Sequence, residues 1–153
     1  MKHLLIVYHS QTGNTKALAD AVMRGACLPD IEGVYSQALL ARDAGVEDVL
    51  RCDGLILGTP ENFGYMSGGM KDFLDRIFYP LQGRVDGLPY ALFVCAGNDG
   101  SGAKRAVKRI ASGLALKEVQ TPLIFRGQPD DPALHVCTEL GSAMAAGLEL
   151  GVF

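Results

Sequence analysis

Residues 4–15 read Leu-Leu-Ile-Val-Tyr-His-Ser-Gln-Thr-Gly-Asn-Thr, an apolar run that passes directly into a loop of hydroxyl and amide side chains around one glycine. The run predicts a buried β-strand over Leu4–Tyr8, and the apolar spacing after the loop predicts a helix beginning near Asn14. The backbone N–H groups of residues 11–15 would then lie at the positive end of the helix dipole without intrahelical acceptors. The stretch therefore predicts either a phosphate-binding loop or an ordinary strand-to-helix turn capped by a threonine.

The chemistry of this loop favours a single terminal phosphate. The candidate contacts are Ser10, Gln11, Thr12, Gly13, Asn14 and Thr15. Three of these side chains supply hydroxyl donors, and the glycine lets the backbone approach an anion closely. Neither Gly-x-x-x-x-Gly-Lys-Ser/Thr nor Gly-x-Gly-x-x-Gly is present, so the phosphate loop of nucleoside triphosphatases and the pyrophosphate site of dinucleotide-binding folds are both disfavoured.

Composition sets limits on the class of protein. The 153 residues are 48% hydrophobic and 20% charged with a net charge of −3, which predicts one globular domain over residues 1–153 and no nucleic-acid partner. Neither a signal peptide nor an apolar run near the roughly 20 residues of a membrane span is seen, so no membrane partner and a cytoplasmic location are expected. The four cysteines are scattered, which predicts reduced thiols and no metal site.

Apolar runs alternate with segments of helical period along the whole chain. The expected strands are Leu4–Tyr8, Gly33–Tyr35, Leu55–Leu57, Tyr90–Ala96 and one within Val119–Phe125. The expected helices begin near Asn14, after an Asp43 N-cap, near Met70, near Ala103 and at an Asp131-Pro132 cap. Because the strands are apolar throughout rather than alternating, the order predicts an α/β fold with a parallel sheet covered on both faces. Loops 10–15, 59–67 and 97–101 would meet at the carboxyl ends of its strands.

Phosphoacceptor domains of signalling relays share this topology but need other residues. They carry an acidic cluster after the first strand, an aspartate ending the third and a lysine ending the fourth. The corresponding places here hold His9-Ser10, Thr59-Pro60 and Gly97-Asn98, which excludes that class.

Two motifs resemble the flavodoxin-like superfamily, whose members hold FMN non-covalently. Residues 10–15 are similar to its phosphate loop, Ser/Thr-x-Thr-Gly-x-Thr. Residues 58–66, Gly-Thr-Pro-Glu-Asn-Phe-Gly-Tyr-Met, are similar to the Gly-Thr-Pro-x-x-Phe-Gly-x-Met motif of its NAD(P)H:quinone oxidoreductase and NADPH-dependent FMN reductase branch, and a similar helix follows. The resemblance implies a three-layer flavodoxin-like fold with a five-stranded parallel sheet in the order 2-1-3-4-5.

The resemblance also implies a cofactor site. FMN would contact the phosphate loop, a second loop against the isoalloxazine ring and a third loop against its pyrimidine edge. The second and third loops contribute Thr59, Pro60, Glu61, Asn62, Phe63, Gly64, Tyr65, Gly97, Asn98 and Asp99. Glu61 either bonds the flavin or is solvated, and Asp99 either accepts from flavin N3–H or caps the following helix. His9 is expected to be structural.

The activity that this resemblance implies is NAD(P)H-dependent electron transfer to a quinone-like or other small acceptor. The alternative is an electron carrier that serves a redox partner protein. Carriers commonly cover the flavin with aromatics and are strongly acidic, whereas residues 97–102 contain no aromatic and the net charge is only −3. The comparison favours an enzyme whose open flavin face admits a stacked nicotinamide or quinone.

Two further expectations remain open. The chain lacks the insertion that the quinone reductase branch usually carries, so a homodimer or higher homo-oligomer is left undecided, and no catalytic side chain is assigned. Lys104, Arg105, Lys108 and Arg109 form a basic stretch that is either a solvated helix face or an attraction for the NADPH 2′-phosphate or an acidic partner.

Overall fold

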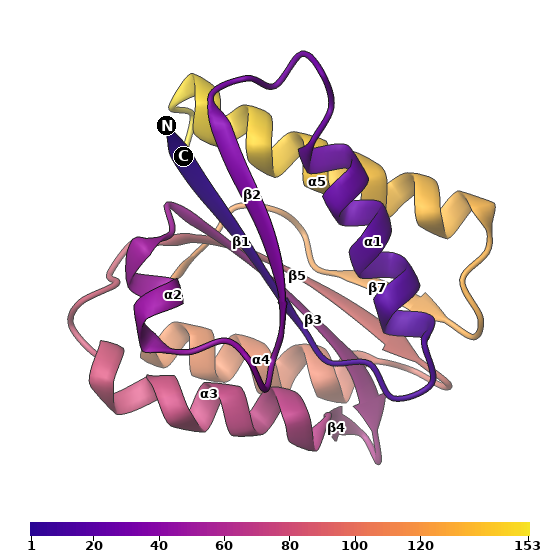
Figure 1. The fold of residues 1–153 in the computed structure, drawn as a ribbon. Helices are drawn as coiled ribbons and strands as arrows, with labels where there is room; N and C mark the ends of the chain where they lie inside the picture. Colours follow the sequence, from indigo (N-terminus) through magenta and orange to yellow (C-terminus); the bar gives the residue numbers. More distant parts are fainter.

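A computed structural model describes all 153 residues as a single sheet between two layers of helices (Figure 1). The strands are β1 (Lys2–Tyr8), β2 (Val34–Leu40), β3 (Gly54–Asn62), β4 (Tyr65–Met66), β5 (Pro89–Ala96), β6 (Lys117–Glu118) and β7 (Leu123–Arg126). The helices are α1 (Asn14–Ala26), α2 (Val46–Arg51), α3 (Gly68–Leu81), α4 (Ser101–Gly113) and α5 (Asp131–Leu150). None of these helices is both long and apolar enough to span a membrane.

The sheet follows the order β2-β1-β3-β5, after which β6 and β7 both pair with β5. All of these pairings are parallel, and only the short β4 runs antiparallel, against β3. The predicted 2-1-3-4-5 order is therefore confirmed, with β5 as its fourth strand. The strand predicted within Val119–Phe125 corresponds to β7, and the two-residue β6 precedes it outside the predicted range.

Two apolar cores lie on the two faces of the sheet, as the apolar strands predicted. Helices α1 and α5 cover one face, and α2, α3 and α4 cover the other (Figure 1). Successive residues of β1 point to opposite faces, so Leu5 and Val7 join the core under α3 and α4 while Leu4 and Ile6 join the core under α1 and α5. This two-sided burial explains why the strands read as continuous apolar runs.

Several predicted element boundaries are wrong by a few residues. The second strand is longer than Gly33–Tyr35, because β2 is a half-buried edge strand whose polar residues weaken the apolar signal. The N-cap of α2 is Gly45 rather than Asp43, and its N–H donates to the Asp48 carboxylate at 2.8 Å. The N-cap of α5 is Asp130 rather than Asp131, since the Asp130 side chain accepts from the N–H of Ala133 at 2.9 Å.

Helices α1 and α5 cross in close contact at two glycines. A Cβ on Gly25 would lie 1.8 Å from the backbone oxygen of Thr138, and one on Gly141 would lie 1.9 Å from the backbone oxygen of Val22. Backbone on both sides leaves no flexible side chain to move aside. The crossing therefore holds α1, and the loop that precedes it, at a fixed position against the sheet.

Substitution at this crossing tests how tightly α1 is held. Gly141→Ala is expected to lower the free energy of unfolding by roughly 1–3 kcal/mol, the usual cost of overpacking a core. Gly68→Ala is the matched control, because a Cβ there meets nothing within 4 Å. Urea denaturation of both variants measures the difference, and equal stabilities would contradict the close crossing.

Candidate functional site

Loops that are distant in sequence meet at the carboxyl end of the sheet. They enclose a cavity of about 220 Å³, small beside the roughly 300–1,000 Å³ of pockets that hold whole ligands. Its lining residues are Gln11, Thr12, Asn14, Thr15, Pro60, Glu61, Asn62, Cys95, Ala96, Gly97, Gly127 and Gln128. A hydrogen bond of 3.2 Å from Asn62 Nδ2 to Gln11 Oε1 joins the first loop to the second. The structure thus places half of the sixteen predicted contact residues around one cavity.

Ser10 organises the first loop from within. Its Oγ accepts the N–H of Gly13 at 3.1 Å and the N–H of Lys16 at 3.2 Å, so this oxygen shapes the turn and its proton remains free to be donated. Gly13 is the N-cap of α1 with φ of 99°, a left-handed conformation that disfavours any residue with a Cβ. Gly13 and Ser10 therefore hold the loop in shape around the cavity.

The start of α1 presents donors without acceptors. The N–H groups of Gln11, Thr12, Asn14 and Thr15 have no hydrogen-bond partner in the protein, and α1 has neither a side-chain cap nor an acidic residue in its first turn. The side chain of Thr15 is 2% exposed and lines the cavity. Free amides at a helix start, together with the Thr12 and Thr15 hydroxyls, form a site for an anion.

No cation competes for that role. Lys16 Nζ lies 2.8 Å from the Asp20 carboxylate one turn along the helix, and this hydrogen bond raises the pKa of Lys16. The loop would hold a phosphate through amides, hydroxyls and the helix dipole alone. These donors fit the phosphate of FMN.

The second loop is a hairpin that rests on buried polar groups. Thr59 is fully buried, and its Oγ1 accepts the N–H of Ser67 at 3.1 Å while it lies 2.8 Å from the carbonyl of Pro60. Ser67 caps α3 by accepting the N–H of Met70, and His9 Nδ1 lies 2.8 Å from its Oγ. Thr59 and His9 therefore support the hairpin from beneath, which for His9 agrees with the structural role expected from the sequence.

The tip of the hairpin carries an unusual residue. Asn62 and Tyr65 pair across a two-residue turn in which Phe63 and Gly64 have φ of 54° and 71°. Two positive φ angles are typical of a type I′ hairpin turn, where asparagine and glycine are preferred and a bulky residue is strained. Phe63 is fully exposed and does not line the cavity, whereas Tyr65 and Gly64 line a groove between α3 and α4.

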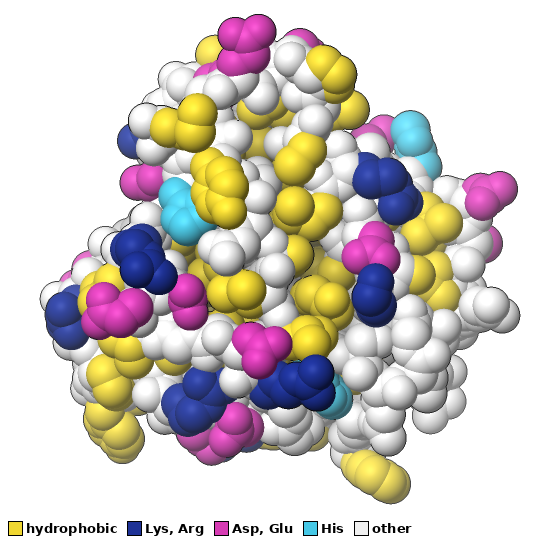
Figure 2. All heavy atoms as spheres, viewed as in Figure 1, with side chains coloured by type: hydrophobic (Ala, Val, Ile, Leu, Met, Phe, Trp, Pro, Cys, Tyr) yellow, Lys and Arg dark blue, Asp and Glu magenta, His cyan; other side chains and the backbone are white.

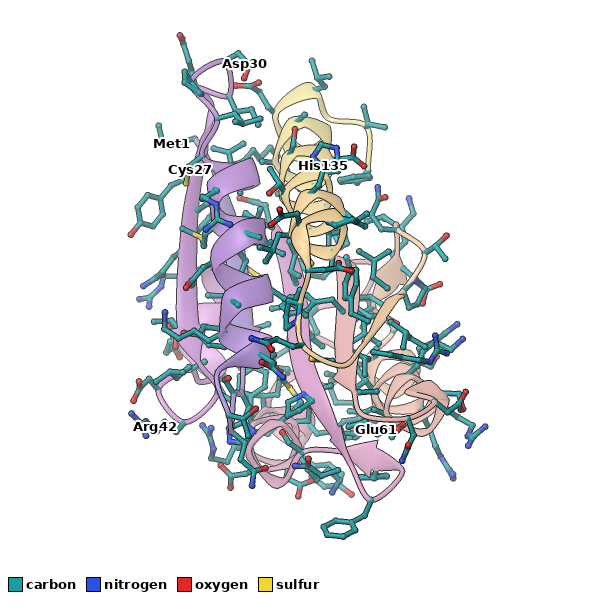
Figure 3. All side chains as sticks on the ribbon, turned by 90° about the vertical axis from the view of Figure 1, so that its right-hand side faces the viewer. Met1, Cys27, Asp30, Arg42, Glu61 and His135 are labelled. Carbon is teal, nitrogen blue, oxygen red and sulfur yellow. The ribbon has the colours of Figure 1, made fainter.

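Glu61 connects the second loop to the third. Its Oε1 accepts the N–H of Gly100 at 2.9 Å, and its Oε2 accepts the N–H of Ala103 at 3.0 Å. In Figure 3 Glu61 lies between the hairpin and the start of α4. The side chain is neither simply solvated nor free to approach a ligand with its carboxylate, because both oxygens are engaged in capping α4.

The third loop contributes one residue to the cavity. Gly97 lines it, whereas Asn98 and Asp99 are exposed. The Asp99 carboxylate accepts from the N–H and the hydroxyl of Ser101 and lies 3.9 Å from the guanidinium of Arg126. Of the two roles proposed for Asp99, the structure supports the contact with the helix start. Gly100 has a φ of 80° and a Cβ there would lie 2.5 Å from Ile124, so this glycine is required by backbone and packing.

Sequence reasoning missed the contribution of two strand ends. Gly127 and Gln128 follow β7, and Cys95 and Ala96 end β5, so all four reach the same edge as the three predicted loops. Burial raises the pKa of Cys95, and its thiol donates weakly to the carbonyl of Gly127 at 3.7 Å. The missed signal was the Gly-Gln-Pro turn after the last strand, because every parallel strand must end at this edge.

Comparison with known proteins identifies the family. Residues 9–128 match the family described as NADPH-dependent FMN reductase. The chain belongs to this family. The prediction from the sequence motifs is thereby confirmed, as is its consequence for the class of protein, an FMN-binding oxidoreductase.

Two relatives are similar to this chain in sequence. A protein named flavodoxin from Aquifex aeolicus (strain VF5) is 37% identical over 114 residues, which cover 74% of this chain and 60% of that one. An NAD(P)H dehydrogenase (quinone) from Acidithiobacillus ferrooxidans is 29% identical over 161 aligned positions, which cover 92% of this chain and 75% of that one.

The solved structures bear on the fold. A flavodoxin from an archaeon aligns over 96% of this chain and 99% of its own, with a TM-score of 0.82 and 21% identity. Flavodoxin 1 from Bacillus cereus aligns over 95% and 98%, with a TM-score of 0.81 and 17% identity. At this level of identity the likeness confirms the predicted flavodoxin-like fold alone.

Removing one hydroxyl from the first loop tests the phosphate assignment. Thr12→Ala is expected to weaken FMN binding about 10–100-fold, the equivalent of the roughly 1.5–3 kcal/mol of a hydrogen bond to a charged group. Riboflavin has no phosphate and should be affected little. Fluorescence titration with both ligands measures this, with the exposed Thr121→Ala as control; equal losses for the two ligands would refute a phosphate contact.

Replacing one carboxylate oxygen tests the connection made by Glu61. In Glu61→Gln the side-chain NH₂ would face a backbone N–H, so the unfolding free energy of the FMN-free protein should fall by about 1–3 kcal/mol. Glu32→Gln is the control, because the Glu32 side chain is exposed and takes part in no hydrogen bond or ion pair. A change no greater than that of the control would show that Glu61 is merely solvated.

Proposed function

We propose that this protein is an FMN-dependent oxidoreductase that accepts hydride from NAD(P)H and passes electrons to a quinone-like or other small acceptor. The observation that carries the proposal is the cavity at the carboxyl edge of the sheet, in which free amides of α1 supply an anion site and no aromatic of the third loop covers the mouth. Such a mouth leaves room for a second planar molecule against a flavin ring.

The chain's own residues position the cofactor. The free amides of Gln11, Thr12, Asn14 and Thr15 and the hydroxyls of Thr12 and Thr15 would bind the phosphate. Pro60–Asn62 with Gly97 would border the ring. Glu61 holds the second loop against α4, so the two walls of the mouth keep a constant separation. FMN supplies the redox chemistry, which takes two electrons from a nicotinamide and gives them to an acceptor.

Electron transfer without a substrate is the second candidate, and the Aquifex relative named flavodoxin favours it. A carrier would serve a redox partner protein. Carriers of basic partners gain from a strong negative field, whereas this chain has a net charge of −3, and its third loop offers no aromatic to stack on a ring. The enzyme is therefore the better-supported candidate. Assembly as a homodimer or higher homo-oligomer and a cytoplasmic location stay predictions.

Anaerobic mixing separates the two candidates. FMN-loaded protein is expected to lose its oxidised-flavin absorbance within seconds of adding excess NADPH or NADH, and a soluble quinone such as benzoquinone should restore it. Stopped-flow absorbance measures both steps. The control is free FMN at the same concentration with the same nucleotide. Bleaching no faster than the control, over minutes, would refute the enzyme and leave the carrier.

A further inference from the structure

A second concave surface lies on the far side of the β3–β4 hairpin from the FMN cavity. It is a groove of about 580 Å³ between α3 and α4, within the range of pockets that hold small molecules. One wall carries Arg105 and Arg109 from α4, and the other carries Tyr65, Phe78 and Tyr79. We call this feature the α3–α4 groove.

The cations on α4 have few partners. No carboxylate lies within 4 Å of Lys104, Arg105 or Arg109, and Lys108 reaches Glu118 at 3.5 Å. Residues 104 and 108, like 105 and 109, place equal charges four apart, which costs an isolated helix a few tenths of a kcal/mol for each pair. Nitrogen-tipped side chains project from the outer side of α4 in Figure 3. Folding alone gives no reason to gather these charges.

Helix α3 shows the opposite arrangement. Lys71 lies 2.7 Å from Asp75, and Arg76 lies 2.9 Å from Asp72, both one turn apart. In Figure 2 dark blue and magenta side chains are accordingly interleaved over the lower part of the molecule, where α3 lies in Figure 1. Of these two helices, α4 therefore carries the unbalanced positive charge, and two of its guanidiniums line the groove.

Aromatic residues line the groove together with these guanidiniums. Tyr79 is 80% exposed although it is large and partly apolar, and its ring meets Phe78 edge-on with centroids 5.3 Å apart. A Cβ on Gly113 would lie 2.9 Å from the Phe78 ring, so α4 packs closely against that aromatic. A groove lined by aromatic rings and by two guanidiniums suits a ligand that combines a flat base with phosphates.

The groove begins next to the FMN cavity. Gly64 and Gly102 line its upper end, and they touch so closely that a Cβ on Gly102 would lie 2.0 Å from the Gly64 carbonyl oxygen. Only the two-stranded hairpin, about 5 Å from strand to strand, separates the groove from the cavity. At a rise of 1.5 Å per residue, Arg105 and Arg109 lie roughly 5 and 10 Å along α4 from Gly102. An extended dinucleotide with one end at the flavin can reach both.

We propose that the α3–α4 groove binds the adenosine 2′-phosphate end of NADPH, with Arg105 and Arg109 on the phosphates and Tyr79 against the adenine. The inference rests on the proposed function, in which NAD(P)H is the donor, and it names the group that selects NADPH over NADH. An acidic protein is the competing occupant for a basic surface. The concave form and the aromatic wall favour a small planar ligand.

Binding to a fragment of the donor tests the groove without any redox step. The probe is 2′,5′-ADP, titrated by calorimetry into both the FMN-free and the FMN-loaded wild type. Arg105→Ser and Arg109→Ser should each weaken it about 10–100-fold, and Tyr79→Ser about 5–10-fold, as expected for charge-assisted bonds and for a stacking contact. Arg24→Ser is the control, because Arg24 is an exposed cation of α1 without an ion pair. It should leave binding unchanged.

Steady-state kinetics measure the selectivity for NADPH over NADH. The arginine variants should raise KM for NADPH about tenfold or more with little change for NADH, and kcat should stay constant. Two results would overturn the proposal: displacement of 2′,5′-ADP by inorganic pyrophosphate at equal concentration, or 2′,5′-ADP binding that none of the three groove variants weakens. Either would indicate a general anion surface, such as one for an acidic protein. If 2′,5′-ADP binds in the groove but NADPH fails to bleach the flavin, the groove assignment stands and the proposed enzyme fails.

Discussion

Unpaired backbone amides at the starts of helices are the constraint on which this structure depends. Each helix leaves its first N–H groups without intrahelical acceptors, and buried amides must find partners. Ser67 serves α3, Asp130 serves α5, and Glu61 reaches across from another loop to serve α4. The start of α1 and the loop before it leave the N–H groups of Gln11, Thr12, Asn14 and Thr15 without acceptors, and these residues line the cavity. The candidate site is therefore a helix start whose free amides lie at a cavity.

Cofactor binding is thereby linked to the stability of the fold. An anion at α1 would supply acceptors for these free amides, so FMN binding should stabilise the folded state, and the stabilisation should grow with the logarithm of the FMN concentration above its Kd. The close crossing of α1 with α5 at Gly25 and Gly141 holds the amides in place before the ligand arrives. A preformed site of this kind loses little conformational entropy on binding.

Local patterns and short motifs were enough to predict the strand order, the two cores, the family and a first loop that leads into a helix at the carboxyl edge of the sheet. Contacts that exist only between distant segments could not be predicted in this way. Glu61 looked like a loop carboxylate, and its partners lie about forty residues away at Gly100 and Ala103. The hairpin turn at Phe63-Gly64 was hidden because its first position usually favours asparagine or glycine. Asp99 was ambiguous for the same reason, since only Ser101 and Arg126 in space decide its contacts.

The proposed phosphate site at the first loop and the proposed nucleotide site on α4 would bind anions in two different ways. The first loop uses amides and hydroxyls in a partly enclosed cavity, with its nearest lysine neutralised by Asp20. Helix α4 would use solvent-exposed guanidiniums, those of Arg105 and Arg109, which form no ion pair. Salt screens exposed charges far more strongly than enclosed hydrogen bonds, with a Debye length of about 8 Å at physiological ionic strength. A cofactor held by amides and hydroxyls in the cavity would stay bound as ionic strength changes. A nucleotide held by the exposed guanidiniums of α4 would bind and leave readily. A resident cofactor needs the first behaviour, and an exchanging substrate needs the second.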